Sequence, residues 1–225
     1  MWDLVTAWAS EQRLVLGQVK VEDKSNEITA IPALLELLDI SGAIITIDAM
    51  GTQTEIVRQI RQKKLMFVLA LKANHPTLHS QVKNWFDQAQ AHNFEGIKFS
   101  YDYRLEKGHH RLEKRWCWAV PLEAFGGLYQ PQQWLGLKSI VMVKRIRHLW
   151  NKTTHEVQFY LSSLPADAQI IGKAIRKHWG IENQVHWTLD VTFNEDKCRI
   201  RSWHSPRNFG LLRRLALNAL NQEST

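Results

Sequence analysis

The sequence is poor in cysteine and has no long hydrophobic run. Only two of its 225 residues are cysteines, Cys117 and Cys198, and they stand far apart without a paired motif. Reduced thiols are therefore expected rather than a disulfide framework. No apolar run approaches the roughly 18 to 20 residues of a membrane span, and MWDLVTAWASEQR at the start lacks the basic flank and hydrophobic segment of a secretion signal. These absences favour a cytoplasmic protein without a membrane partner.

Acidic residues are scarce in the last part of the chain. Residues 1–137 hold 15 Lys and Arg against 15 Asp and Glu, whereas residues 138–225 hold 14 against 7, which accounts for the whole net charge of +7. A basic part beside a neutral part suggests a surface for a polyanion, with nucleic acid as the first candidate. A solvated cationic face that binds nothing is the alternative.

The first 92 residues read as alternating strands and helices. Two strands at 4–9 and 13–21 form a hairpin, and a helix through Leu38 follows. Further along, Thr52 and Glu55 have the spacing of a capping box for a helix that reaches about Lys63. Short apolar runs predict buried strands at 43–47 and 65–71, and a helix follows over 75–91. This order predicts parallel strands in an α/β sheet.

Polar residues follow both buried strands. Asp48 comes directly after the first, and Lys72 to Asn74 form the turn after the second. In open sheets of this class, functional groups collect outside the carboxyl ends of the strands. Asp48 could instead accept backbone amides of its own turn, but Ala49 to Gly51 already provides a flexible turn and leaves the carboxylate free.

Residues 93–163 read as a mostly β insertion. Short strands are expected at 95–100, 101–106, 112–120, 138–148 and 156–161. The segment VKRIRHLWNK places Lys144, Arg145 and Arg147 near Trp150, an arrangement that suits phosphates and a stacked base. An edge strand protected by charge is an equal alternative.

The segment 168–196 reads as a helix with one inward stripe. Ile171, Ile175, Val185 and Leu189 recur at helical spacing, and Glu182 lies seven residues after Ile175 and seven before Leu189. Glu182 is therefore expected to point inward, where a lone carboxylate is costly unless a cation, a metal or donors pair with it. An ion pair with a neighbouring Arg or Lys and a catalytic metal site both satisfy this requirement. A zinc site that uses His178, Glu182, His186 and Asp190 is a less favoured third option.

The chain ends with a basic segment and a helix. Lys197, Arg199 and Arg201 alternate through an extended stretch, and Ser205 with Pro206 opens the helix. We expect this helix to pack on the sheet with Arg213 and Arg214 outward. Its inward residues are expected to be Leu211, Leu212, Leu215, Leu217 and Leu220.

Asp48 and Glu182 are expected to meet in space, one at a strand's end and the other on a helix crossing that end. Converging carboxylates hold Mg²⁺ or Mn²⁺ and leave positions open for phosphate and water. Two such ions support phosphodiester chemistry, because they activate the attacking oxygen and stabilise the leaving one.

Four segments, in order and spacing, closely resemble the H-repeat-associated insertion-sequence transposases. They are GQVKVEDKSNEITAIPALLELLDISGAIITIDAMGTQ, LKANHP, HWGIENQVHWTLDVTFNED and RNFGLLRRLALNAL. The resemblance implies a DDE catalytic domain of ribonuclease-H-like fold, a mixed α/β sheet flanked by helices with a β insertion before the last catalytic helix. It further implies two Mg²⁺ or Mn²⁺ ions, with Asp48 as the second aspartate and Glu182 as the glutamate of the metal site.

The resemblance also implies partners and supporting residues. The partners are transposon-end and target DNA and a second copy of the chain, in a bacterial cytoplasm and on the nucleoid when DNA is bound. His186, Asp190 and Asn183 would orient Glu182. The expected DNA contacts are Lys72, Asn74, Lys144, Arg145, Arg147, Arg176, Lys177, Arg199 and Arg201. The expected division is a first core part at 1–92, the insertion at 93–164 and the completing helices at 165–225.

Two departures from the family pattern bear on activity. The first aspartate lies in a segment resembling Ile-Asp-Gly-Lys on a strand before the one at 4–9, and Asp3 does not match it. In addition, His178 and Leu189 stand where the broader signature has an arginine and a lysine. We therefore expect weak or absent strand cleavage by this chain. A non-catalytic DNA-binding remnant that regulates an intact transposase is the alternative function.

Overall fold

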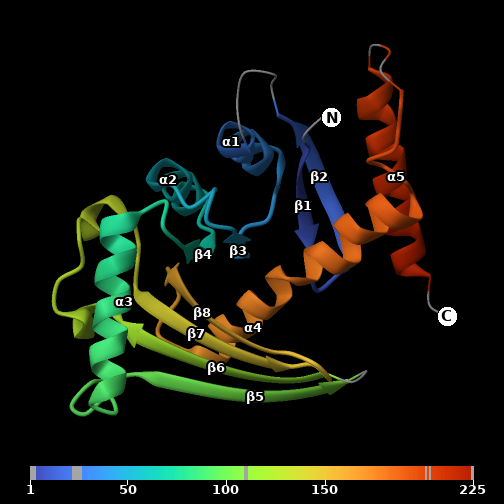
Figure 1. The fold of residues 1–225 in the computed structure, drawn as a ribbon. Helices are drawn as coiled ribbons and strands as arrows, with labels where there is room; N and C mark the ends of the chain where they lie inside the picture. The colour runs from blue at the N-terminus through green and yellow to red at the C-terminus, as the bar shows by residue number, and fades with distance from the viewer. Residues whose placement is uncertain (1–3, 22–26, 109–110, 201, 203, 224–225) are drawn as a thin grey trace. The chain divides into compact units, whose positions relative to one another are not determined.

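The computed structural model describes residues 4–21, 27–108, 111–200, 202 and 204–223 (Figure 1). The chain folds into two compact units. The larger unit is Ser41–Ile175, and the smaller combines Met1–Ile40 with Arg176–Thr225. Each unit has a sheet and a hydrophobic cluster of its own. Among the described residues, no helix has the length and apolar character that a bilayer crossing requires.

The larger unit is built on a six-stranded mixed sheet in the order β3-β4-β8-β7-β6-β5. β3 and β4 are parallel, as the sequence predicts, and every other neighbouring pair is antiparallel. The strands are β3 (Ile44–Ile47), β4 (Met66–Leu71), β5 (Ser100–Gly108), β6 (Arg111–Pro121), β7 (Ser139–His148) and β8 (Thr153–Ser162). The predicted β insertion thus continues the sheet begun by β3 and β4, while the three-part division of the chain stays a prediction.

Helices flank this sheet on both faces. α2 (Thr54–Gln62) connects β3 to β4, α3 (Pro76–Ala91) follows β4, and α4 (Ala168–His178) follows β8. Neighbouring residues of a strand point to opposite faces. Phe159 of β8 stacks on Phe86 of α3, whereas the adjacent Tyr160 belongs to the cluster that contains Ile171 of α4. α3 and α4 therefore cover opposite faces, and the predicted mixed α/β class is confirmed, consistent with a ribonuclease-H-like transposase fold.

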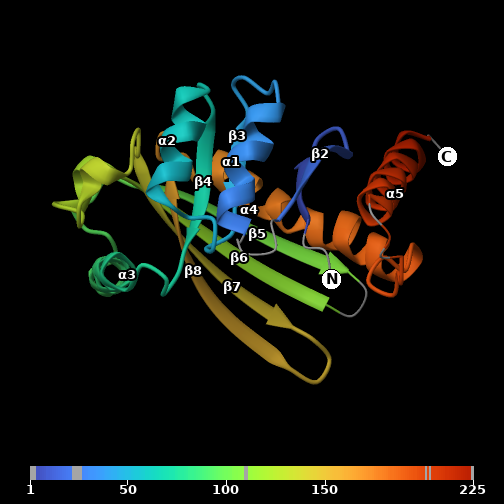
Figure 2. The same cartoon turned by 90° about the horizontal axis from the view of Figure 1, so that it is seen from above.

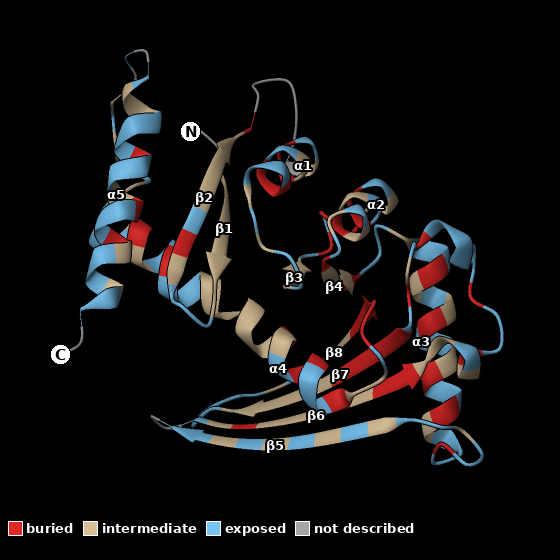
Figure 3. Ribbon diagram, turned by 180° about the vertical axis from the view of Figure 1, so that it is seen from behind, coloured by how far each residue is buried: buried red, intermediate tan, exposed pale blue. Residues whose placement is uncertain are grey.

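The core lies where α3 and α4 cover the strands. The first half of β7 is buried, whereas its second half is only partly buried, and β5 alternates between partly buried and exposed positions (Figure 3). β5 to β8 continue as two long hairpins away from α3 (Figure 2). Two short 3-10 helices, Leu122–Phe125 and Pro131–Gln133, connect β6 to β7.

The strand predicted at 95–100 is wrong. Asn93 and Phe94 adopt left-handed backbone conformations with φ of 52° and 58°, and Phe94 N–H donates to Ala89 O at the end of α3. This turn occupies the segment up to Gly96, so the strand begins only at Ser100. Its apolar residues cover the end of α3, because Phe94 packs against Phe86.

The smaller unit is built on an antiparallel hairpin. It contains β1 (Leu4–Ala9), β2 (Leu14–Lys20), α1 (Glu27–Leu37), α5 (Ser205–Gln222) and two π-helical segments (Glu182–His186 and Thr188–Thr192). Its core joins Val15, Val185, Leu189 and Leu217. Asn218 of α5 completes the hydrogen bonding of β2: its side-chain oxygen accepts from Val15 N–H at 2.7 Å and its amide donates to Val15 O at 2.9 Å.

The predicted orientation of α5 is wrong for most of its side chains. Of the five leucines expected to face inward, only Leu217 is buried; the exposed ones are Leu211, Leu212, Leu215 and Leu220. Arg214, expected outward, is buried instead, because Glu195 provides a carboxylate at 2.8 Å. α5 packs on the β1–β2 hairpin and the π-helical segments rather than on a broad sheet, and this narrow contact covers one strip of the helix.

Candidate metal and nucleic-acid site

Asp48 lies in the turn directly after β3, with an exposed carboxylate. Its Oδ1 accepts the backbone N–H of Met50 at 3.1 Å, a local bond that fixes the side chain on its turn. In the part of the chain that the structure describes, no Lys, Arg or His side chain forms an ion pair with this carboxylate. Both sequence interpretations of Asp48 are therefore partly right, since one oxygen holds the turn and the side chain still faces solvent.

The turn that carries Asp48 is tied to the end of β4. The fully buried Thr52 hydroxyl contacts Ala70 O at 2.6 Å and Asp48 O at 3.2 Å. Asn74 donates to Ala49 O at 2.6 Å. His75 Nε2 lies 2.6 Å from Thr52 O, and since a carbonyl only accepts, this nitrogen carries the proton. These contacts hold the Asp48 turn and the turn after β4 together as one rim of the larger unit.

The predicted capping box of Thr52 and Glu55 is wrong, because the Thr52 hydroxyl bonds to Asp48 O and Ala70 O. The residue that caps α2 is Gln53, and its side chain makes no capping hydrogen bond. Thr52 stands one position too early, and its hydroxyl donates to strand-end carbonyls instead of accepting from the helix. Glu55 pairs with Arg58 on the helix surface.

Replacing Thr52 with valine should lower the free energy of unfolding of the larger unit by about 1–3 kcal/mol, since the partly buried carbonyl of Ala70 loses its bond to the buried hydroxyl. Urea denaturation, monitored together with amide exchange of β3 and β4, measures the change. The matched control is Thr77→Val at an exposed position of α3, for which a change within about 0.5 kcal/mol is expected. Equal effects of the two substitutions would contradict the role given to Thr52.

Glu182 lies in the smaller unit and is exposed, so its predicted inward orientation is wrong. The hydrogen bonds of the segment run from residue i+5 to residue i, as Trp187 N–H to Glu182 O and Phe193 N–H to Thr188 O show. This wider π-type winding shifts the helix phase after α4, which invalidates the seven-residue spacing argument. Val185 and Leu189 remain buried as predicted.

The side chains expected to orient Glu182 occupy the same π-helical stretch. Asn183 donates to Trp179 O at 3.5 Å, and His186 is exposed. Burial raises the pKa of Asp190, and the carboxylates of Asp196 and Glu195 raise it further, while His186 opposes them. Acidic side chains therefore gather at the end of this segment, with Arg214 beside them, and the orienting roles stay predictions.

Asp48 and Glu182 belong to different units, so their convergence on one metal ion stays a prediction. Within the described part of the chain, no group of three or more His, Cys, Asp and Glu side chains is arranged to hold a metal. The zinc arrangement of His178, Glu182, His186 and Asp190 is therefore not formed.

Three of the expected DNA contacts lie on β7, and the structure separates them. Arg145 pairs with Glu156 of β8, and Arg147 Nε lies 3.1 Å from Glu113 Oε2 of β6. Lys144 points to the opposite face, between Trp116 and Val157 on the neighbouring strands. The alternative of an edge strand protected by charge is wrong, because β7 pairs with β6 on one side and β8 on the other. Its two arginines instead pair with acidic residues of those neighbouring strands.

The other expected DNA contacts are distributed over both units. Lys72 is exposed at the end of β4, and Asn74 is engaged with Ala49. In the smaller unit Lys177 pairs with Glu11, and Arg199 is exposed. Arg176 is partly buried at the end of α4, and Arg201 lies outside the described residues.

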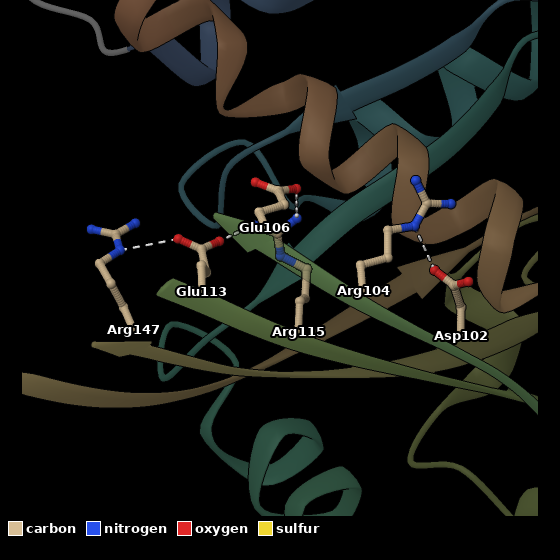
Figure 4. A network of polar contacts seen from close by, with 6 residues as sticks. All are labelled: Asp102, Arg104, Glu106, Glu113, Arg115 and Arg147. Carbon is tan, nitrogen blue, oxygen red and sulfur yellow. Dashed lines mark hydrogen bonds and ion pairs between the residues drawn. The ribbon is translucent and has the colours of Figure 1, made fainter. Parts of the chain in front are cut away.

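A buried carboxylate at the centre of an ion-pair network was missed by sequence reasoning. Glu113 is 2% exposed and pairs with Arg115 and Arg147, while Arg115 also lies 3.4 Å from Glu106 (Figure 4). Burial acts to raise the pKa of Glu113, but the guanidinium groups of Arg115, Arg147 and Arg145 outweigh it and hold the pKa below its ordinary value. The acidic and basic residues that alternate along β5 and β6 are the sequence feature from which such a network could have been predicted.

Comparison of the sequence with known proteins identifies the protein family to which the chain belongs. The chain matches the transposase DDE domain over residues 3–219, and it belongs to that family. It is 38% identical over 96% of its length to "Putative transposase YncI" of Escherichia coli O157:H7. It is 36% identical over 98% of its length to both "H repeat-associated putative transposase YhhI" and "Putative protein YbfL" of Escherichia coli strain K12. The predicted family is thereby confirmed.

The chain spans somewhat more than half the length of these relatives, 55% of the first and 58% of the other two.

Proposed function

We propose that this chain forms part of the catalytic centre of a DDE-type transposase that cuts and joins DNA at insertion-sequence ends. Asp48 and Glu182 are proposed as ligands of Mg²⁺ or Mn²⁺. The observation that carries the proposal is Asp48 itself, an exposed carboxylate without a described cation partner on a turn tied to two parallel strands. Family membership gives that carboxylate its chemical context.

The donor set fits a hard divalent cation. Such ions prefer carboxylate oxygens and keep water or phosphate in open positions. Glu182 is exposed, like Asp48, and among the described residues no Lys, Arg or His side chain forms an ion pair with it. When bound, a pair of such ions would activate an attacking oxygen and stabilise a leaving one.

The chain's own residues would orient the ligands and hold the DNA. Thr52, Asn74 and His75 hold the Asp48 turn in place, while His186, Asp190 and Asn183 are proposed to orient Glu182. Phosphates would be held by the cationic residues Lys72, Lys144, Arg176, Lys177 and Arg199. The proposed partners are transposon ends, target DNA in the cytoplasm and a second copy of the chain.

Activity of these 225 residues alone is expected to be weak. Only two of the family's three carboxylates have matching positions here, Asp48 and Glu182. Metal binding is therefore a better readout than strand cleavage.

Asp48→Asn and Glu182→Gln should each weaken Mn²⁺ binding by about 10- to 100-fold, a range produced even by loss of a group that only supports a metal ligand. Electron paramagnetic resonance of free Mn²⁺ during titration measures the affinity. The control is Glu55→Gln, which removes an exposed carboxylate of the same unit as Asp48. If the protein binds DNA with steep salt dependence and neither substitution changes Mn²⁺ binding, the non-catalytic regulator becomes the better account.

A further inference from the structure

The four long strands of the larger unit have two faces of different chemistry. Cross-strand partners in an antiparallel sheet point to the same side, so the register assigns every side chain to a face. Figure 4 shows acidic and basic side chains rising from the same side of the strands. These ion-pair-face residues are Asp102, Arg104, Glu106, Glu113, Arg115, Arg145, Arg147 and Glu156. Cys117 on this face lies against Gly172 of α4, so this is the α4 side.

The opposite side, here called the aromatic–lysine face, is not covered by α4. One row across it runs Tyr103, Trp116, Lys144 and Val157 on β5, β6, β7 and β8. The rings of Tyr103 and Trp116 have centroids 5.3 Å apart. The adjacent row is Leu105, Lys114, Ile146 and His155, and Tyr101 borders the part covered by α3.

This face is exposed although much of it is apolar. Tyr103 is 43% exposed, and Tyr101, Leu105 and Val157 are exposed to a similar degree. The turn between β7 and β8, at the end of these two strands, carries Trp150, which is 88% exposed. Contiguous exposed apolar surface of this kind marks an interaction site.

The charges on the aromatic–lysine face have one sign. Lys144 and Lys114 lie among the aromatic and aliphatic side chains, and Lys107 continues the pattern along β5. The carboxylates of Asp102, Glu106, Glu113 and Glu156 all point to the ion-pair face. Among the described residues of these four strands, no carboxylate therefore lies on the aromatic–lysine face. The sheet thus sorts its charges: balanced pairs on one side, uncompensated cations among exposed rings on the other.

We propose that the aromatic–lysine face binds an unpaired DNA strand, with bases stacked on Tyr103 and Trp150 and phosphates at Lys144 and Lys114. Exposed aromatic side chains bind the faces of unstacked bases without sequence preference, and a cationic groove or face follows the backbone. Duplex DNA offers no free base faces. A protein partner is disfavoured because Lys144 stands in the middle of the patch, where protein interfaces are depleted in lysine.

That the strand is DNA rests on the proposed transposase function, since the face by itself recognises stacked bases and phosphates. The assignment adds to that function a surface for the unpaired strand on the larger unit. It also separates Lys144 from Arg145 and Arg147, although all three lie in one basic segment of the sequence.

The test is binding of a fluorescein-labelled single strand of about 20 thymidines, longer than the site sizes of about 4–16 nucleotides that stacking surfaces occupy. Fluorescence anisotropy is measured in chelator, without divalent ions. Tyr103→Ala and Trp150→Ala should each weaken binding about fivefold or more. Lys144→Glu should weaken it and reduce the slope of log affinity against log salt by about 0.7 for each phosphate released.

Matched controls lie on the same unit. Tyr129→Ala removes an equally exposed tyrosine (46%) beyond β6, and Lys83→Glu reverses a charge on α3. Both should leave the affinity within about twofold, as expected of surface substitutions away from a site. Trp150→Ala keeps the inference testable if Tyr103→Ala loosens the sheet, because Trp150 lies in an exposed turn.

Three results would overturn the inference. The first is an unchanged affinity of Tyr103→Ala, Trp150→Ala and Lys144→Glu for the single strand. The second is equal weakening by these variants and the two controls. The third is dissociation of a dimer by Tyr103→Ala in sedimentation, which would make the face a contact between copies. Loss of Mn²⁺ binding in Asp48→Asn would stand in all three cases, so the proposed function would survive the failure of this inference.

Discussion

Replacing Glu113 with alanine is expected to lower the free energy of unfolding of the larger unit by about 3–5 kcal/mol, the cost of removing one partner from a buried ion pair. The carboxylate is 2% exposed and pairs with Arg115 of its own strand, β6, and with Arg147 of the neighbouring strand β7. Its loss leaves the Arg115 side chain, itself only 10% exposed, without its closest anion. Urea denaturation measures the loss, and amide exchange of β6 and β7 assigns it to this sheet.

The same carboxylate makes stability depend on pH. Its pKa is held below the ordinary value of 4.5 in the folded protein. Its contribution is therefore present above that value and is lost as the pH falls through the folded pKa. Wild-type stability should decline below about pH 4.5 more steeply than that of Glu113→Gln, since glutamine has no proton to take up. Identical pH profiles would show that Glu113 is not held as an anion.

The second large effect is expected at Arg214 in the smaller unit. Its guanidinium lies 2.8 Å from Glu195, 3.1 Å from Gly210 O and 3.3 Å from the Thr6 hydroxyl, and its side chain is 7% exposed. Arg214→Leu should lower the free energy of unfolding of this unit by about 3–5 kcal/mol, because Glu195 keeps its charge and loses its closest cation. Hydrogen exchange of β2 and α5 amides measures the change.

Arg213→Leu is the matched control for this prediction. Arg213 is the neighbouring residue of the same type, and it lies 3.8 Å from the same carboxylate oxygen. At that distance the pair should contribute about 1 kcal/mol or less. Equal destabilisation by both arginine substitutions would contradict the prediction that the buried Arg214–Glu195 pair stabilises this unit more than the Arg213–Glu195 pair does.

The sequence predicted the parts of the fold in which local pattern and packing agree. The continuous apolar runs before Asp48 and before Lys72 specify strands buried on both faces, and the helical segment between them requires parallel pairing. β3 and β4 pair in parallel as predicted. β4 is mostly buried, but the predicted burial of β3 is wrong, since all four of its residues are only partly buried. The position of Asp48 at the end of β3 follows directly from the predicted strand.

Predictions of side-chain direction failed where winding or a distant partner decided the outcome. The phase of Glu182 assumed regular α-helical winding, and two π-helical segments changed it. The leucine pattern of α5 predicted a broad buried face, but the hairpin offers only the strip around Leu217. Nothing in the sequence near Arg214 identified Glu195 as its partner, because the contact joins a helix to a loop 19 residues away.

The two faces of the long strands were only half predictable. β5 alternates Tyr101, Tyr103 and Leu105 with Asp102, Arg104 and Glu106, so the sorting of side chains within one strand is visible in the sequence. The register that aligns Lys144 with Trp116 and Arg147 with Glu113 depends on pairing between distant segments. For that reason the sequence alone does not divide the basic residues of β7 between the two faces.

The central claim is that Asp48 and Glu182 bind the same divalent metal ion, and metal-directed backbone cleavage tests it most directly. Fe²⁺ replaces Mg²⁺ at oxygen-ligand sites, and with ascorbate and peroxide it produces radicals that cut the nearby backbone. We expect cuts near residue 48 and near residue 182, both suppressed by excess Mg²⁺ and both lost in Asp48→Asn and in Glu182→Gln. Cuts at only one position, or cuts near residue 182 that persist in Asp48→Asn, would contradict a shared metal site.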